Sequence, residues 1–475
     1  MYLKQYFLGC LAHASYMIAD EESKTAAVVD PQRDIGQYLE DAVANGFTIR
    51  HVFLTHFHAD FVAGHLDLRD RVGAEVHLGA KAEAEYDFSP AREDQPLALG
   101  PTVRLGFLET PGHTPEAISI LVFDSAQDGV KPRAVLTGDA LFIGDVGRPD
   151  LMASVGVTSE QLAGMLYDTL HQKLLKLPDD TLLYPAHGAG SLCGKNMSSE
   201  TVSTIGKQKQ FNYACQPMTR GDFIRLVTAD QPEAPAYFSY DATMNRREHA
   251  SLDSVLAAVL RPLSLDEAIR RANAGAQLLD TREPAHFAQG HIAGSVNVGL
   301  GGKYATWCGI VLDRARPIVI VADPGRENEA AMRLGRIGFD QIAGYVDGGF
   351  AAAAAEPSLV SRVERVTPAQ AAERLASSAP PVVVDVRGPG EWEAGHLEGS
   401  LNIPLPVLKR SLDDIPAGRP VLLHCQSGYR SMIAASLLLR EGVRNFMDLD
   451  GGIAAWTKED RPVAAPVGAG CSTAN

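Results

Sequence analysis

The sequence predicts an α/β protein built from several domains. Its 475 residues correspond to about three domains at roughly 150 residues each. In the second half, runs such as VVVD and PIVIV, which are typical of buried strands, alternate with segments of helical pattern. In the first half, strand-like runs at residues 51–55 and 134–137 are separated by loops that contain histidine. Strands that alternate with helices in this way favour parallel sheets covered by helices.

Composition excludes several classes of partner. The chain has 43 Lys and Arg against 58 Asp and Glu, a formal net charge of −15, so it lacks the basic excess that binds nucleic-acid phosphates. No apolar run approaches the roughly 18 residues that span a bilayer. The first residues, MYLKQYFLGCLAHASYMIAD, are interpreted as a pair of strands and not as a signal peptide. The six scattered cysteines form no CxxC pair, which argues against a disulfide framework. We therefore expect a cytoplasmic protein with no nucleic-acid or membrane partner.

The second half of the chain contains an internal repeat. LLDTREPAHFAQGHIAGSVNV at residues 278–298 matches VVDVRGPGEWEAGHLEGSLNI at residues 383–403, with a constant offset of 105. A later pair, DGGF ending at Phe350 and DGGI ending at Ile453, has an offset of 103. Two similar domains therefore follow one another. We expect domains at residues 1–255, 262–358 and 363–460, followed by a loose tail at residues 461–475.

The strongest local signal is THFHADF at residues 55–61, directly after a strand-like run. Three further motifs downstream, PGHT, TGDALFIGDVGRPD and YPAHG, add two histidines and an aspartate. Neutral imidazoles and carboxylates that converge from strand ends suit a catalytic metal with open coordination positions. The candidate residues are His56, His58, Asp60, His113, Asp139 and His187.

This pattern resembles the metallo-β-lactamase superfamily over about residues 1–255. The resemblance implies an αββα sandwich with the metal at one edge. Hydrolases of that superfamily usually carry HxHxDH and hold two zinc ions, whereas the last position here is Phe61, which has no lone pair to donate. The second metal pocket therefore loses a ligand, and a single metal is favoured. His65 follows four residues later, and we expect it on a helix surface.

Within the superfamily, the segment GDALFIGDVGRPDL is similar to the persulfide dioxygenases. The iron of that family is held by two histidines and one aspartate, which the motifs carry over to His56, His113 and Asp139. The resemblance implies one Fe(II) per chain, with positions left for O₂ and a sulfur substrate. Around these ligands we expect three further groups, which orient the ligands or contact bound oxygen: His58, Asp60 and His187.

Cys193 lies six residues after His187 in a glycine-rich loop. Two interpretations stay open: an incidental loop cysteine, or an accessory thiol near the metal that accepts or passes on a sulfur atom. Cys10, Cys215 and Cys308 are expected to be packing residues.

The second repeat contains VLLHCQSGYRSMIAASLLLREG, in which Cys425 lies between a strand and a helix. Backbone N–H groups and the helix dipole at such a junction favour a thiolate, and Arg430 adds a positive charge. Together with DVRGPGEWEAGHLEGSLNIP, this domain resembles the rhodanese sulfurtransferases. Four residues separate Cys425 from Arg430, where the related phosphatases have five, and the tighter ring suits a persulfide sulfur. Asp385 and Arg387 are expected to tie the strand end to the loop.

The first repeat reads VIVADPGREN where the cysteine is expected. We place Asp323 at the cysteine position, with two residues between it and Arg326. A carboxylate cannot carry a persulfide sulfur, so we expect a catalytically silent rhodanese domain that serves packing, docking or spacing.

The whole chain looks like the persulfide dioxygenase–rhodanese fusions of sulfide detoxification. This resemblance implies O₂-dependent oxidation of a low-molecular-weight thiol persulfide to sulfite, and sulfur transfer at Cys425 that forms or uses thiosulfate. The identity of the thiol stays open, and so does the oligomeric state, with a homo-oligomer among the options. One alternative is a zinc-dependent, glyoxalase II-like thioester hydrolase with a rhodanese relay. Another is a sulfur carrier without catalysis at the metal.

Overall fold

The computed structural model describes residues 1–127, 130–151, 156–229, 231, 233–416 and 418–464. Contacts divide them into two units, one formed by Met1–Ala257 with Met332–Asp340 and the other by Ala258–Ala331 with the chain from Gln341 onward. Among the described residues, no helix combines the length and the apolar composition that crossing a bilayer requires.

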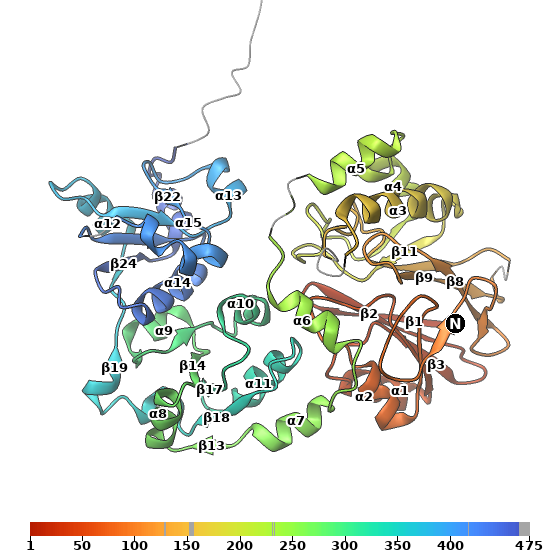
Figure 1. Cartoon of the computed structure of the whole chain (residues 1–475), viewed down its shortest axis with the longest axis horizontal. Helices are drawn as coiled ribbons and strands as arrows, with labels where there is room; N and C mark the ends of the chain where they lie inside the picture. The colour runs from red at the N-terminus through yellow and green to blue at the C-terminus, as the bar shows by residue number, and fades with distance from the viewer. Residues whose placement is uncertain (128–129, 152–155, 230, 232, 417, 465–475) are drawn as a thin grey trace, which may run out of the picture. The chain divides into compact units, whose positions relative to one another are not determined.

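The first unit is an αββα sandwich (Figure 1). Its described strands form two six-stranded sheets, ordered β1-β2-β3-β4-β5-β6 and β12-β11-β10-β9-β8-β7. Helices α1 and α2 cover the outer face of the first sheet, and α3, α4 and α5 cover that of the second. The strands are β1 (Tyr2–Leu8), β2 (His13–Ala19), β3 (Thr25–Val29), β4 (Thr48–Phe53), β5 (Glu75–Gly79), β6 (Ser89–Ala91), β7 (Leu97–Ala98), β8 (Val103–Glu109), β9 (Ile118–Asp124), β10 (Ala134–Gly138), β11 (Leu182–Pro185) and β12 (Ser203–Thr204). The helices are α1 (Gly36–Asn45), α2 (His65–Val72), α3 (Ser159–Gln172), α4 (Ile205–Phe211), α5 (Arg220–Thr228), α6 (Tyr237–Met244) and α7 (Leu252–Val259).

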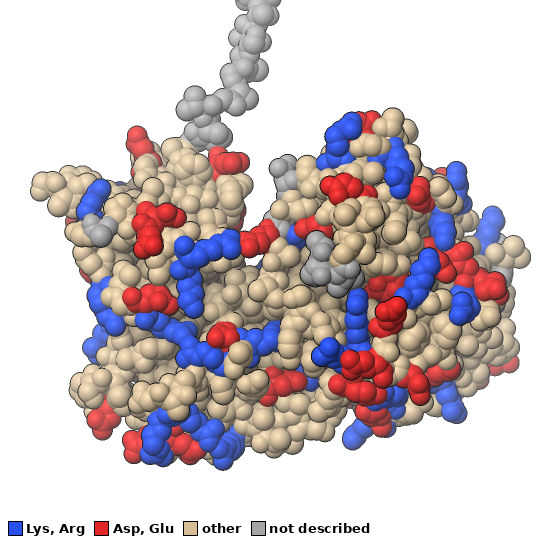
Figure 2. Space-filling model, viewed as in Figure 1, with Lys and Arg blue, Asp and Glu red and all other residues tan. Residues whose placement is uncertain are grey.

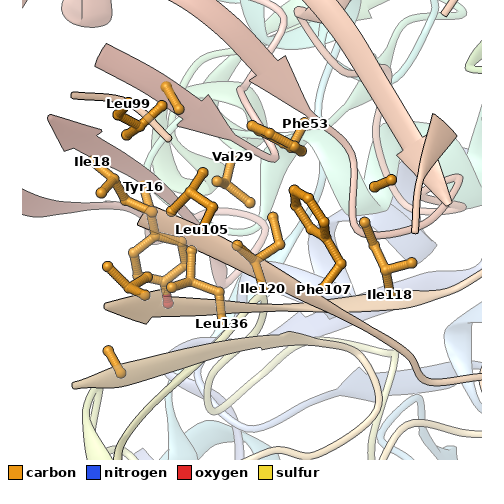
Figure 3. Close-up of a cluster of buried hydrophobic side chains, with 14 of the residues drawn as sticks. Tyr16, Ile18, Val29, Phe53, Leu99, Leu105, Phe107, Ile118, Ile120 and Leu136 are labelled. Carbon is orange, nitrogen blue, oxygen red and sulfur yellow. The ribbon is translucent and has the colours of Figure 1, made fainter. Parts of the chain in front are cut away.

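A continuous apolar core holds the two sheets together (Figure 3). Alternate residues of a strand point to one face of its sheet, so Tyr16 and Ile18 of β2 point into the same core. Ile118 and Ile120 of β9 meet them from the opposite sheet. The N-terminal segment pairs as antiparallel β1 and β2, as expected, and the predicted αββα sandwich is confirmed.

The second unit contains two small parallel sheets, one from each repeat. Their orders, β13-β18-β17-β14-β16 and β20-β24-β23-β21-β22, are equivalent. The central strands are buried on both faces, which explains their continuous Val, Ile and Leu runs. The first repeat has β13 (Pro262–Leu263), α8 (Leu265–Asn273), β14 (Gln277–Asp280), α9 (Pro284–Gln289), β15 (His291–Ile292), β16 (Val296–Asn297), α10 (Tyr304–Val311), β17 (Ile318–Val321), α11 (Glu327–Gly335) and β18 (Ile342–Val346). The second has β19 (Val360–Ser361), which pairs with β15, and β20 (Arg365–Val366), α12 (Pro368–Leu375), β21 (Val382–Asp385), α13 (Pro389–Ala394), β22 (Leu401–Asn402), β23 (Val421–His424), α14 (Tyr429–Arg440), β24 (Phe446–Leu449) and α15 (Gly452–Lys458).

The sheet register corrects the residue placed at the cysteine position of the first repeat. Asp280 pairs with Val321, and the equivalent Asp385 pairs with His424. The residue after Val321 therefore corresponds to Cys425, and that residue is Ala322, not Asp323. Three residues, not two, then separate this position from Arg326. The offset between the repeats is 105 at β14 and 103 at β17, so the motif around β14 does not by itself locate the residue that corresponds to Cys425.

The predicted tail begins too early. Ala464 forms an isolated antiparallel bridge with His396, and the Nε1–H of Trp456 donates to the carbonyl of Pro462 at 2.9 Å. Residues 461–464 therefore belong to the second repeat, and residues 465–475 lie outside the described residues.

Basic and acidic side chains are interspersed on the face shown in Figure 2. This distribution agrees with the net charge of −15 in offering no broad basic surface on that face.

Candidate metal centre and sulfur-transfer loop

The candidate metal ligands follow the ends of neighbouring strands. His56 lies after β4, His113 after β8, Asp139 after β10 and His187 after β11. Gly147 allows the loop that follows Asp139 to return close to the Asp139 backbone, since a Cβ atom at this glycine would lie 2.0 Å from the Asp139 carbonyl oxygen. The strand ends thus bring residues that are far apart in sequence to one edge of the sandwich.

Three of these residues form a compact group of donors. One ligand atom each from His56, His113 and Asp139 lies within 4.8 Å of the others. The Asp139 Oδ2 is 3.5 Å from the His113 Nε2 and 3.8 Å from the His56 Nε2. The His113 Nδ1 lies 2.8 Å from the backbone carbonyl oxygen of Arg148, to which it can donate, and this leaves the Nε2 lone pair for a metal.

The surroundings of Asp139 fit a bound cation. Both carboxylate oxygens are buried and, apart from the adjacent Cys193 thiol, have no hydrogen-bond partner among the described residues. Burial raises the pKa of Asp139 to about 6, and it lowers the pKa of His113 to about 4, which favours the neutral imidazole. A buried carboxylate without a partner is costly, and a metal ion removes that cost. The donor set therefore fits the metal that the motifs imply.

The remaining predicted residues form a second group beside the first. Ligand atoms of His58, Asp60 and His187 also lie within 4.8 Å of one another, and the His187 Nε2 is 3.7 Å from the Asp139 Oδ1. The Nε2 of His58 lies 2.9 Å from a carboxylate oxygen of Asp30. Burial disfavours protonation of His58, but this carboxylate outweighs it and raises the His58 pKa. Asp30 also accepts from the backbone N–H of Thr55, so it anchors the start of the histidine loop.

Phe61 places an aromatic ring where the HxHxDH pattern has a histidine. The ring is buried, and its centroid lies 4.4 Å from that of His58 and 4.1 Å from that of His13. His13 is a buried neighbour that sequence reasoning missed, since it lies in β2 outside any motif; neither of its ring nitrogens has a partner among the described residues. On the side of the second group where Phe61 lies, the neighbouring atoms are therefore aromatic carbons, which cannot bind a metal ion.

His65 is not on a helix surface, as was expected. It is fully buried at the start of α2, with its Nε2 2.8 Å from the hydroxyl of Tyr86. That hydroxyl in turn donates to the carbonyl of Asn245. His65 therefore ties α2 to the segment after α6 and is not part of the donor groups.

Cys193 lies with the donor groups. Its Sγ is within 4.8 Å of ligand atoms of Asp139 and His187. Burial raises the thiol pKa well above its usual value, and the Asp60 and Asp139 carboxylates raise it further. The five described cysteines are all free thiols. The position of Cys193 suits an accessory thiol, whereas its raised pKa disfavours the thiolate that would accept sulfur, so both interpretations stay open.

A cavity of about 300 Å³ opens beside His113. Its walls are mostly apolar, with Phe57 and Phe238 among them, and Arg246 lines one side. The Arg246 guanidinium lies 5.0 Å from the centroid of the Phe57 ring, and its Nε is buried with no hydrogen-bond partner among the described residues. No described carboxylate forms an ion pair with Arg246. Sequence reasoning missed this residue because no motif contains it.

In the second repeat, the loop after β23 surrounds a buried thiol. Cys425 is 1% exposed, and its Sγ accepts the backbone N–H of Gly428 at 3.1 Å. Gly428 has a φ of +96°, a conformation that favours glycine and turns this N–H inward. The guanidinium of Arg430 donates to both carboxylate oxygens of Glu391, at 2.6 and 2.7 Å. Glu391, in α13, is a partner that sequence reasoning did not identify.

Asp385 and Arg387 have the structural role that was expected. The Arg387 guanidinium binds the Asp385 carboxylate and donates to the carbonyl of Gly395 at 2.7 Å. Asp280 and Arg282 repeat this arrangement in the first repeat. Both pairs fix a strand end to the loop that follows it.

Comparisons with known proteins agree with this architecture. The metallo-beta-lactamase superfamily profile matches residues 8–187, and the rhodanese-like domain profile matches residues 264–356 and 367–459. A persulfide dioxygenase, the mitochondrial ETHE1 of Homo sapiens, is 28% identical over 217 residues, which cover 44% of this chain and 74% of that protein. A hydroxyacylglutathione hydrolase of a Bradyrhizobium species is 30% identical over 245 residues, covering 50% of this chain and 83% of the hydrolase.

A sulfurtransferase of Allochromatium vinosum is 34% identical over 96 residues, which cover 20% of this chain and 90% of that protein. Among solved structures, a metallo-beta-lactamase of Staphylococcus aureus aligns with a TM-score of 0.65 and 29% identity, over 73% of this chain and 98% of that one. The chain therefore belongs to the metallo-beta-lactamase superfamily, as a member whose N-terminal domain resembles the persulfide dioxygenases and is followed by two tandem rhodanese domains.

Proposed function

We propose that the N-terminal domain is a persulfide dioxygenase with one non-haem iron, and that the second rhodanese repeat is a thiosulfate sulfurtransferase. The observation that carries the first part is the convergence of His56, His113 and Asp139 on one point, beside a pocket in which Phe61 replaces a ligand. Two imidazoles and one carboxylate are the donor set of facial-triad iron sites. The combination suits the detoxification of sulfide through persulfides.

The dioxygenase reaction converts R–S–S⁻, O₂ and H₂O into R–SH, SO₃²⁻ and H⁺. A bound Fe(II) would supply open coordination positions for O₂ and the terminal sulfur. The chain's own residues orient the ligands and the substrate: the Arg148 carbonyl fixes the His113 ring, and the apolar cavity beside His113 takes the organic part of the persulfide. Arg246 offers that organic part a partner for an anionic group.

The sulfurtransferase reaction takes place at Cys425. The thiolate attacks the outer sulfur of R–S–SH, R–SH leaves, and Cys425 holds the sulfur as Cys–S–S⁻. Sulfite then attacks this outer sulfur, and the S–S bond breaks with its electron pair returning to Cys425, giving S₂O₃²⁻. The inward N–H of Gly428 stabilises negative charge on Cys425. The reverse direction uses the same residues.

Cys193 is proposed as an accessory thiol of the metal site, because it lies next to Asp139 and His187. The first repeat is proposed to be silent in catalysis, because the Ala322 methyl group cannot carry sulfur.

A zinc-dependent thioester hydrolase is the second candidate for the N-terminal domain. It is favoured by the group of His58, Asp60 and His187, which offers ligand atoms for a second ion, and by the similarity to a hydroxyacylglutathione hydrolase. Phe61 counts against it, because its ring can donate nothing to that ion.

The two candidates differ in substrate and in product. Iron-loaded protein is supplied with glutathione persulfide, cysteine persulfide or coenzyme A persulfide while O₂ uptake and sulfite are recorded. We expect persulfide-dependent uptake with one sulfite formed per O₂. Hydrolysis of S-lactoyl-glutathione without any persulfide-dependent uptake would establish the hydrolase instead.

A further inference from the structure

Two histidines and a glutamate form a further group of donors in the first unit, separate from the candidate metal centre. One ligand atom each from His51, Glu75 and His77 lies within 4.8 Å of the others. His51 lies in β4, and Glu75 and His77 lie in β5. None of the three belongs to the donor groups described above. They lie within strands, whereas the residues of the candidate metal centre lie in the loops that follow the strand ends.

The register of the parallel strands places the three side chains on one face of the first sheet. His51 pairs with Glu75, and Phe53 pairs with His77. Residues two apart in a strand point to the same face, and Phe53 lies in the core between the two sheets (Figure 3). His77 is buried and Glu75 is half-exposed. The group therefore lies on the inner face of the sheet, at the margin of that core.

The three donor atoms have the spacing of zinc ligands. The His51 Nδ1 lies 3.0 Å from the His77 Nε2, and the Glu75 Oε2 lies 3.6 Å from each of these nitrogens. Ligand atoms of a tetrahedral zinc, at about 2.0–2.2 Å from the ion, lie roughly 3.3–3.6 Å apart. An ion among the three atoms would therefore contact all of them after small side-chain movements, and a water molecule would complete the tetrahedron.

Neighbouring residues hold two of these ligands in place. The ring of His77 stacks on that of Phe53, with centroids 4.5 Å apart and an angle of 16° between the planes. The hydroxyl of Ser89, in β6, donates to the Glu75 Oε1 and leaves the Oε2 facing the imidazoles. Ligands of metal ions are usually oriented by partners of this kind.

Both histidines are available as neutral ligands. Burial lowers the pKa of His51 and of His77 by more than the Glu75 carboxylate raises it, and the charge of Arg50 lowers that of His51 further. In neutral rings, two nitrogens 3.0 Å apart need a proton between them. A cation replaces that proton, accepts both lone pairs and balances the Glu75 charge.

We propose that His51, Glu75 and His77 bind a divalent transition-metal ion such as Zn²⁺, which links β4 to β5. Imidazole and carboxylate donors suit Zn²⁺, whereas Mg²⁺ and Ca²⁺ prefer oxygen ligands. Because β4 leads directly into the loop of His56, the ion stabilises the strand that carries this loop. The inference does not depend on the reaction proposed for either domain.

This site is weaker than a site among the buried donor groups, because Glu75 is half-exposed and only three protein ligands converge. We expect it to release its ion during gel filtration. Metal analysis of gel-filtered protein therefore counts the ions held by the buried donor groups alone.

The test loads the full chain with zinc, removes free and weakly bound metal by gel filtration and then titrates the protein with Zn²⁺ in a calorimeter. We expect the parent protein to bind one further ion per chain. Glu75→Gln and His51→Gln should each weaken this binding by about tenfold or more, since loss of a mere partner of a ligand already costs roughly 10- to 100-fold. The matched controls are Glu40→Gln and His286→Gln, at exposed residues of α1 and α9, and they should bind as the parent does.

Thermal unfolding provides a second measurement on the same proteins. Added Zn²⁺ should raise the Tm of the parent and of both controls, because an ion that binds only the folded state stabilises it by mass action. The rise should be absent in Glu75→Gln, and the Tm of this variant without added zinc shows that it is folded. A parent protein that binds no further ion would overturn the inference. A further ion bound with unchanged affinity by both Glu75→Gln and His51→Gln would also overturn it, since the ion would then lie elsewhere.

Discussion

At the scale of single residues, Phe61 is the residue on which the proposal of a single metal ion in the N-terminal domain depends. Its ring fills the space between His13 and His58, where the two-zinc hydrolases have a donor nitrogen. The group of His58, Asp60 and His187 is still present, so one substitution separates the two arrangements.

Phe61→His should therefore increase the metal content from about one to about two ions per chain, because it restores an imidazole to the second group. Metal analysis of protein reloaded with excess zinc provides the measurement. The parent protein binding two zinc ions under the same conditions would contradict the role given to Phe61.

Arg246→Met should weaken the use of persulfides that carry a carboxylate. A hydrogen bond to a charged group contributes about 1.5–3 kcal/mol, so its loss corresponds to a roughly 10- to 100-fold lower kcat/KM. N-acetylcysteine persulfide and N-acetylcysteamine persulfide differ only in the carboxylate, so the effect should appear with the first and not with the second.

The matched control is Arg247→Met, since the neighbouring Arg247 is exposed and paired with Glu85 at 3.2 Å. An equal loss with both persulfides would show that Arg246 only packs against Phe57.

The sequence could predict the residues that lie inside motifs, but not those that reach the sites from elsewhere. His56, His113, Asp139 and Cys425 were identified because short spacings and strand ends mark them. His13 and Arg246 carry no local signal, since only the folded chain brings them close to the metal site. His65 was misplaced because its environment depends on Tyr86, 21 residues away.

At the scale of elements, strand–loop junctions determine where the chemistry can occur. The strands and the repeat were predictable from apolar runs and matching motifs, and the αββα layers from the family resemblance. The register of the first repeat was not, because the offset changes from 105 at β14 to 103 at β17. Ala322, and not Asp323, is therefore the residue of the first repeat that is equivalent to Cys425.

Ala322→Cys in a Cys425→Ser background should not restore sulfur transfer. Three residues separate position 322 from Arg326, against four between Cys425 and Arg430, and the Arg326 guanidinium is bound by Glu329 at 2.7 Å. Thiosulfate formation from persulfide and sulfite measures the outcome. Recovery to a substantial fraction of the parent rate would show that the first repeat lacks only its thiol.

At the scale of the whole molecule, the residues of the two proposed reactions belong to different units, and the sulfite proposed as the product of one reaction is the sulfur acceptor in the other. Cys425→Ser should abolish thiosulfate formation and leave sulfite production from persulfide within about twofold, because the metal ligands all lie in the first unit. Separate quantification of sulfite and thiosulfate, with Cys10→Ser as the control, measures both. Loss of both products together would mean that the sites do not act independently.

The most direct test of the account is O₂ uptake by metal-free protein reloaded with either Fe(II) or Zn(II) in the presence of a thiol persulfide. We expect about one equivalent of Fe(II) to restore uptake, and Zn(II) to restore none, because the proposed ligands His56, His113 and Asp139 would provide the donor set of one facial-triad iron site. Hydrolysis of S-lactoyl-glutathione restored by Zn(II), with no uptake at any iron loading, would contradict it.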